Sequence, residues 1–308
     1  MTNAEQSEDL EVTFTGVHVH AANQVHVSSI VDEYAEERQD HALIFSWIDG
    51  HWTHRPIENS IGGLCVVDEP TPKVLNMGID GLISVFNLPG FDTEHVDRSP
   101  DGPSYSKHLK CIRRIDGSVY VAGMARQVYR REDRGRWLRC DQGARSHRGR
   151  TRGAVGFCSI DGPSENEIYG VGYKGEIWMF DGAIWTEVAS PTNILLTGVR
   201  CSPEGEVYAC GLGGVILCGR ERKWRIIEQD VTEKDFWGIT IFGGSLYLSN
   251  YDGLFRLDDQ VLRRVDLGLR KTITTAYLDS CNEMLWSVGH KDLTFTSDGR
   301  RWKHTPTP

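Results

Sequence analysis

A repeat of 39 residues in the C-terminal half is the feature that most constrains the fold of this chain. Four aromatic residues lie at intervals of 39 residues in similar segments: Tyr169, Tyr208, Tyr247 and Trp286. A second column, just after a Gly-bearing turn, keeps the same spacing: Ile177, Ile216, Phe255 and Thr294. A period of this length is typical of one propeller blade built from four short strands. Because apolar residues alternate on both sides of these turns, we predict antiparallel hairpins.

Two further columns complete the repeating unit. A small residue precedes the first predicted strand at Gly156, Gly198, Gly238 and Ala276. A large apolar residue opens the last predicted strand at Trp185, Trp224, Leu262 and Trp302. Each unit therefore predicts four strands of about four to six residues, the usual strand length.

The N-terminal half fits the same template with longer insertions. We therefore predict an all-β fold, a single seven-bladed β-propeller of four-stranded antiparallel blades. Radial closure of such sheets protects their edges from pairing with other chains. After an N-terminal tail at 1–10, the predicted blades cover residues 11–58, 59–107, 108–148, 149–193, 194–234, 235–273 and 274–308.

Composition and cysteine usage favour a cytoplasmic protein. The net charge is −9, and no apolar run approaches the roughly 20 residues of a membrane helix. The start of the sequence lacks the basic and apolar regions of a signal peptide. Eight cysteines are scattered without a Cys-x-x-Cys pair, mostly in apolar alternations. We interpret them as reduced core residues and expect neither a cofactor nor contact with a membrane.

One turn motif resembles a known family. Asp-Gly-x-x-Trp occurs at Asp181, Gly182 and Trp185, and again at Asp298, Gly299 and Trp302; a shorter form has Asp49, Gly50 and Trp52. These units resemble bacterial β-propeller repeat proteins with Asp-box-like turns of the BNR or sialidase type, and the resemblance implies the propeller fold. Physically, Asp accepts backbone hydrogen bonds, Gly adopts a positive φ, and Trp covers the space between blades. We therefore interpret these residues as structural.

Histidines concentrate in the first blade and are a candidate metal site. Six of the eleven lie between residues 18 and 54. His18 and His20 share one face of a predicted strand, and such a pair binds Zn²⁺ when further ligands are present. No convincing further ligand is apparent in the sequence, and His26 aligns with the aromatic column. We therefore assign no metal ligand and no catalytic residue.

Arginines concentrate between residues 126 and 152, where ten Arg face only three acidic residues. This local surplus of seven positive charges leaves −16 on the rest of the chain, which predicts an uneven electrostatic field. Because Arg forms bidentate contacts with phosphate and carboxylate, the segment is a candidate binding surface. The predicted partner-binding residues are Arg130, Arg131, Arg134, Arg145, Arg148, Arg150 and Arg152. The alternative is a connection between blades whose charges pair with the acidic body.

Three segments interrupt the repeat and are the candidate recognition loops: 31–41, 86–104 and 126–152. Binding residues are often found on loops that a rigid scaffold holds in place. We therefore predict a non-catalytic, protein-binding propeller, and more specifically a cytoplasmic immunity protein that neutralises a bacterial toxin. The acidic body would suit a basic toxin.

Two alternatives to this function remain at the level of sequence. One is a propeller lyase or glycan hydrolase with paired carboxylates across its central channel. The other is a ring that binds nucleic acid or another anionic ligand through segment 126–152.

Overall fold

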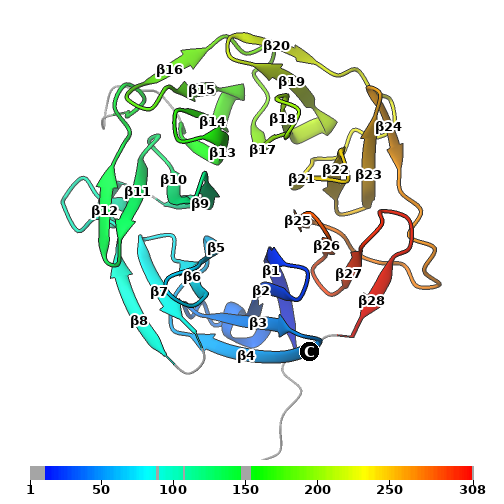
Figure 1. Cartoon of the computed structure of the whole chain (residues 1–308), viewed down its shortest axis with the longest axis horizontal. Helices are drawn as coiled ribbons and strands as arrows, with labels where there is room; N and C mark the ends of the chain where they lie inside the picture. Colours follow the sequence, from blue (N-terminus) through cyan, green and yellow to red (C-terminus); the bar gives the residue numbers. More distant parts are fainter. Residues whose placement is uncertain (1–10, 88–89, 107, 147–153, 307–308) are drawn as a thin grey trace, which may run out of the picture.

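The computed structural model describes residues 11–87, 90–106, 108–146 and 154–306. Figure 1 shows seven sheets arranged around a central opening, so the prediction of a seven-bladed propeller is confirmed. Every sheet has four antiparallel strands paired in chain order. The first strand of each sheet lies nearest the centre and the fourth lies at the rim (Figure 1).

The strands are short, as the repeat predicts. The first three sheets contain β1 (Val12–Ala21), β2 (Gln24–Val31), β3 (Ala42–Ile48), β4 (His51–Ile57), β5 (Gly63–Val67), β6 (Lys73–Met77), β7 (Leu82–Phe86), β8 (Phe91–His95), β9 (Leu109–Ile115), β10 (Ser118–Gly123), β11 (Val128–Asp133) and β12 (Arg136–Arg139). The fourth and fifth sheets contain β13 (Phe157–Ser164), β14 (Glu167–Gly172), β15 (Ile177–Phe180), β16 (Trp185–Val188), β17 (Leu196–Cys201), β18 (Val207–Gly211), β19 (Ile216–Arg220) and β20 (Lys223–Ile226). The last two contain β21 (Gly238–Phe242), β22 (Ser245–Asn250), β23 (Gly253–Asp258), β24 (Val261–Arg264), β25 (Tyr277–Ser280), β26 (Leu285–Val288), β27 (Leu293–Thr296) and β28 (Lys303–Thr305).

The helices of the described residues are short and lie in connections. They are α1 (Asp32–Glu36), α2 (Pro103–Ser106) and the 3₁₀ turns η1 (Tyr173–Gly175) and η2 (Leu212–Gly214). None of them is long and apolar enough to cross a membrane.

Hydrophobic clusters lie between neighbouring blades and hold the ring together. One cluster joins Tyr169 and Val171 of the fourth blade to Leu196 and Val199 of the fifth, and all four side chains are buried. Similar clusters join each of the other neighbouring pairs. The aromatic column lies on the second strands, where Tyr169, Tyr247 and Trp286 are among the largest fully buried side chains. Burying each ring stabilises the fold by about 2 kcal/mol or more, so this column holds the blades in place.

The first and last blades close the ring without sharing a strand. Residues 12–21 form the innermost strand of the first blade. Trp47 of β3 lies 5.7 Å from Trp286 of β26, measured between ring centroids. Side chains from both ends of the chain therefore pack against each other across the seam.

Two of the three candidate recognition loops contain regular strands. Segment 86–104 includes β8, and segment 126–152 includes β11 and β12. These strands belong to the four-stranded sheets of the second and third blades, as the seven-blade template requires. Segment 31–41 is a true insertion, and it carries α1.

The Asp-Gly turns make the hydrogen bonds that their residue types favour. Asp181 Oδ1 accepts from the backbone N–H of Ala183 at 3.0 Å and of Ile184 at 2.9 Å, and Gly182 has a φ of 92°. Asp298 Oδ1 likewise accepts from the N–H groups of Arg300 and Arg301, each at 2.8 Å, beside Gly299. In the shorter turn, Asn23 Nδ2 donates to Asp49 at 2.6 Å.

The tryptophans Trp185 and Trp302 of these turns are both buried. Trp185 packs between Phe157 and Phe180, and its Nε1 donates to the carbonyl of Cys140 in the preceding blade at 2.8 Å. Trp302 is buried in the cluster between the sixth and seventh blades. Both side chains therefore contact a neighbouring blade as well as their own.

Candidate functional site

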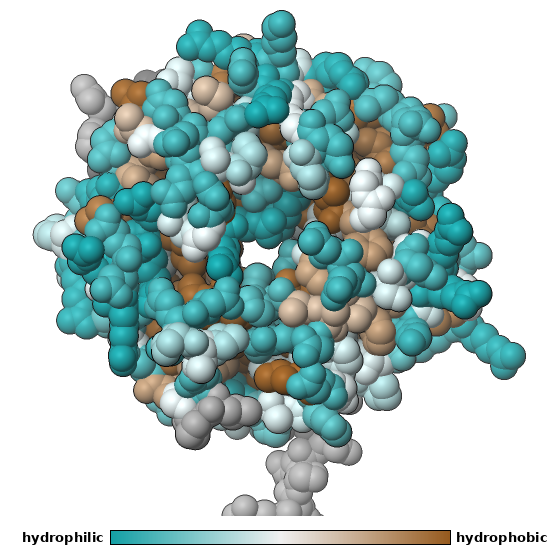
Figure 2. Space-filling model, in the orientation of Figure 1, coloured by the Kyte–Doolittle hydropathy of each residue, from teal (hydrophilic) through white to brown (hydrophobic). Residues whose placement is uncertain are grey.

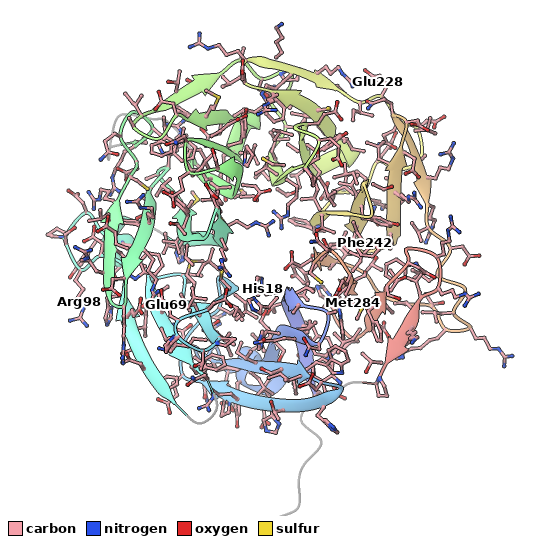
Figure 3. All side chains as sticks on the ribbon, viewed as in Figure 1. His18, Glu69, Arg98, Glu228, Phe242 and Met284 are labelled. Carbon is pink, nitrogen blue, oxygen red and sulfur yellow. The ribbon has the colours of Figure 1, made fainter. Side chains whose placement is uncertain are left out.

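A cluster of charged side chains lies at the central channel. A cavity of about 590 Å³ lies against the inner strands, and charged residues from several blades line it. Figure 2 shows the opening at the centre of a largely hydrophilic face, and Figure 3 places His18 beside it at the inner end of the first blade.

Arg113 of β9 contacts two carboxylates, one from the neighbouring fourth blade and one from the seventh. Its Nε donates to Asp161 of β13 at 3.0 Å, and its Nη1 lies 3.6 Å from Asp279 of β25. Asp279 also accepts from the backbone N–H of Val19 at 2.9 Å and lies 3.3 Å from His18 Nδ1. Both carboxylates therefore have partners, and the cluster links the innermost strands of four blades.

The electrostatics of this cluster keep Asp279 ionised. Burial by itself would raise the pKa of Asp279, but the hydrogen bond from His18 and the charges of His18, Arg113 and Arg200 outweigh it and hold the pKa well below its usual range. A general acid for hydrolysis needs a raised pKa instead. Burial does raise the pKa of Glu176, yet its oxygens accept from Arg126 Nε at 2.6 Å and Gly156 N–H at 2.8 Å. Both carboxylates are therefore engaged by neighbouring positive or N–H groups.

The first-blade histidines are held by different partners. His20 Nε2 lies 3.1 Å from Asp68, while His26 is buried, with its Nδ1 2.8 Å from Ser46 Oγ. His41 Nε2 accepts from the backbone N–H of Val31 at 2.8 Å. Within the described ranges, no group of three His, Cys, Asp or Glu side chains is arranged to hold a metal.

The predicted partner-binding arginines that the structure describes lie on the third blade and face acidic residues. Arg131 is buried and binds Glu94 through two nitrogens, at 3.0 and 2.8 Å, and Glu69 at 2.8 Å. Arg130 donates to Glu165 at 3.0 Å and to Glu132 at 3.1 Å.

The remaining arginines of this group follow the same pattern where they are described. Arg134 pairs with Asp92 at 2.8 Å, and Arg145 pairs with Asp141 at 2.7 Å. Acids from the second, third and fourth blades thus compensate much of the local surplus that the sequence suggested. Arg148, Arg150 and Arg152 lie outside the described residues, and partner binding through this segment stays a prediction.

The two faces of the ring carry different turns and connections. The connection face holds the turns between the second and third strands of each sheet and the connections between blades; the hairpin face holds the other turns. Backbone hydrogen bonds tie turns to connections on the connection face, as from Leu212 N–H to the carbonyl of Leu195 at 3.0 Å. The same antiparallel topology in every blade places equivalent turns at the same end.

Bulky side chains recur at one turn position of the connection face. Tyr173, Leu212, Tyr251 and His290 are 39 residues apart, and none of them is fully buried. Trp237, just before β21, is 38% exposed and lies 5.9 Å from Tyr251, which is 50% exposed; Tyr251 lies 5.0 Å from His290. We call these five residues the aromatic arc. Extending the repeat register to the turns would have revealed four of them, but their exposure is visible only in the fold.

Acidic segments flank the aromatic arc on the same face. Segment 227–237 joins the fifth and sixth blades with four acids and one Lys, and segment 32–41 has five acids and one Arg. Lys291, next to His290, donates to Asp32 of α1 at 2.5 Å, so the arc is continuous with the first blade. Glu228, Asp230 and Glu233 are exposed.

Comparison with known proteins identifies a relative of the same length. No protein-family model matches the sequence. The chain is 36% identical over 293 residues to the immune protein Tsi7 of Pseudomonas aeruginosa, a match that covers 94% of this chain and 95% of the relative. The chain belongs to the Tsi7 family. Since the match includes almost the whole of both proteins, the family shares the entire ring.

Solved structures outside the Tsi7 family share the fold at low sequence identity. Virginiamycin B lyase from Staphylococcus aureus has a TM-score of 0.72 at 14% identity, covering 92% of this chain and 94% of the lyase. The WD40 propeller domain of Doa1 has a TM-score of 0.71 at 13% identity, covering 95% of each chain. YCF48 bound to D1 peptide has a TM-score of 0.66 at 12% identity, covering 97% and 94%. These similarities establish the propeller architecture alone.

Proposed function

We propose that this protein is an immunity protein that binds a bacterial toxin and neutralises it by direct contact. The observation that carries the proposal is full-length kinship with the immune protein Tsi7. The immunity function predicted from the sequence is confirmed at the level of this family. A rigid ring with exposed loops is suited to such binding, because little conformational entropy is lost on association.

The channel chemistry supports a binding role over a catalytic one. Asp161 and Asp279 are engaged by Arg113 and by backbone N–H groups, so the channel cluster stabilises the ring. A lyase has the same fold, but at 14% identity its activity does not transfer to this chain.

Nucleic-acid binding has less support than toxin binding. Phosphate contacts need arginines whose guanidinium groups are available, and Arg131 is buried against Glu94 and Glu69. A protein partner therefore fits the surface better.

We further propose that the protein acts in the cytoplasm. The eight cysteines are free thiols, and burial raises the pKa of Cys65 and of Cys210 to about 12, which makes both thiols unreactive. Such unpaired cysteines are typical of a reducing compartment. Cell fractionation tests this proposal, and recovery in the periplasm contradicts it.

A toxicity rescue experiment tests the immunity function. The polypeptide encoded by the neighbouring gene is expressed in a bacterial host, alone and together with this chain. We expect arrested growth in the first case, restored growth in the second, and a stoichiometric complex of the purified proteins. A neighbouring product that is harmless, or a toxin that this chain neither binds nor neutralises, overturns the proposal.

A further inference from the structure

We propose that the toxin docks on the connection face, with the aromatic arc at the centre of the contact and the acidic segments 32–41 and 227–237 at its edge. The inference rests on the proposed function and specifies where binding occurs. It also specifies the chemistry of the partner, which is a basic protein surface with an apolar centre.

The exposure of the arc is the first observation behind this assignment. Trp and Tyr dominate the binding energy at protein interfaces, because they bury a large area and lose little conformational entropy. Trp237 and Tyr251 are exposed by 38% and 50%, and they pack against each other. Together with His290 they form a contiguous apolar patch that crosses from the sixth blade to the seventh.

The rigid support of the arc is the second observation. Trp237 N–H donates to the carbonyl of Ser249 at 2.9 Å, and Phe14 N–H donates to the carbonyl of His290 at 2.9 Å. Asn250 Oδ1, beside Tyr251, accepts from the N–H groups of Asp252 and Gly253 at 2.9 and 3.0 Å. The backbone of each of these positions is therefore fixed before a partner arrives, which lowers the entropic cost of binding.

Charge complementarity selects the partner. Glu228, Asp230 and Glu233 are exposed in segment 227–237, and Glu33, Glu36 and Glu37 are exposed on and after α1. Acidic groups around an apolar centre attract a basic surface, accelerate association and exclude acidic partners. The described arginines of segment 126–146 oppose this field little, because acids pair with them.

Paired variants on opposite faces of the ring test the proposal. W237A and Y251A remove the centre of the arc, and I184A on the hairpin face removes a side chain that is 48% exposed. With the toxin encoded by the neighbouring gene as the probe, we expect W237A/Y251A to weaken binding by about 30-fold or more and I184A to leave it unchanged. Equal affinity of W237A/Y251A and the parent chain overturns the docking site.

Charge variants test the acidic edge separately. E228K/D230K/E233K should slow association and flatten its dependence on salt, whereas E283K, an exposed acid on the hairpin face, should change neither. If the triple variant associates as fast as the parent chain at low salt, the basic-partner assignment is wrong.

Hydrogen exchange on the parent complex covers the case in which a variant fails to fold. Protection is expected at 173–176, 212–215, 250–252 and 289–291, with the hairpin-face turns unchanged. Protection confined to the hairpin face or to 126–146 overturns the site but leaves the immunity function intact. A parent chain that forms no complex at all defeats the proposed function itself, so the two failures are distinguishable.

Discussion

The backbone N–H of Phe14 donates a hydrogen bond of 2.9 Å to the carbonyl of His290, although 276 residues separate them in the chain. This bond joins the innermost strand of the first blade to a turn of the last one. It also fixes the backbone of His290, whose side chain belongs to the aromatic arc. Closure of the ring and presentation of the proposed docking surface thus depend on the same seam.

The aromatic packing at the seam predicts that the substitution W286A strongly lowers the stability of the fold. Trp286 is fully buried, with Phe295 stacked on it at 4.8 Å and Trp52 at 6.1 Å between ring centroids. Removing such a ring costs about 3–5 kcal/mol, since the transfer free energy is lost and a cavity remains. Urea unfolding measures the change, and F91A, at a side chain 55% exposed, is the control. Equal effects of the two substitutions would contradict the role of the seam.

The buried ion pair between the second and third blades predicts strong coupling of its two residues. Arg131 and Glu94 are 6% and 3% exposed, so R131M leaves a buried carboxylate without its bidentate partner and should destabilise the fold by about 3 kcal/mol. The double variant R131M/E94L should cost less than the sum of the two single variants. R134M, at an exposed pair with Asp92, should cost about 0.5 kcal/mol or less. Additive effects at Arg131 and Glu94 in the double-mutant cycle would argue against the coupling.

The lowered pKa of His26 predicts that the folded state loses stability over a defined range of pH. Burial, reinforced by the charges of His18 and His20, lowers the pKa of His26 from 6.5 to about 3. The unfolded chain therefore takes up a proton below about pH 6.5, while the folded chain does not until about pH 3. Stability that is present above pH 6.5 is lost as the pH falls through this window, at up to about 1.4 kcal/mol per pH unit.

H26F checks the pH prediction through the slope of stability against pH. We expect the variant to lose the contribution of His26 between pH 6 and 4, and to run parallel to the parent chain above pH 7. Parallel curves throughout would show that His26 does not titrate differently in the two states.

The ion pairing of the arginine segment predicts weak binding to nucleic acid. Non-specific binding needs several available cations, and its affinity falls steeply with salt. We therefore expect the chain to elute from a duplex DNA column below about 0.15 M salt. The opposite result is retention of the chain at higher salt, lost in the variant R148Q/R150Q/R152Q. That result would assign a polyanion site to the segment.

The sequence by itself determined the architecture. Strand alternation, the Asp181 and Asp298 turns and the 39-residue register are local or repeated features, and each repeat unit needs neighbours to bury its aromatic residue. The seven-bladed architecture followed from them. The register alone did not give the bounds of β8, β11 and β12, because insertions and runs of charged residues interrupt it in segments 86–104 and 126–152.

Only the tertiary structure decided how the charges are used and which surface is exposed. Arg113, Asp161 and Asp279 come from three blades, and Arg131 meets Glu94 across a blade boundary. Such pairs form only when the ring closes, and they compensate most of the arginines that the structure describes in the basic stretch. In the sequence, Trp237 and Tyr251 are ordinary aromatic residues next to predicted strands. The topology places them together on the connection face. Exposure and long-range pairing are properties of the closed ring, and no local pattern encodes them.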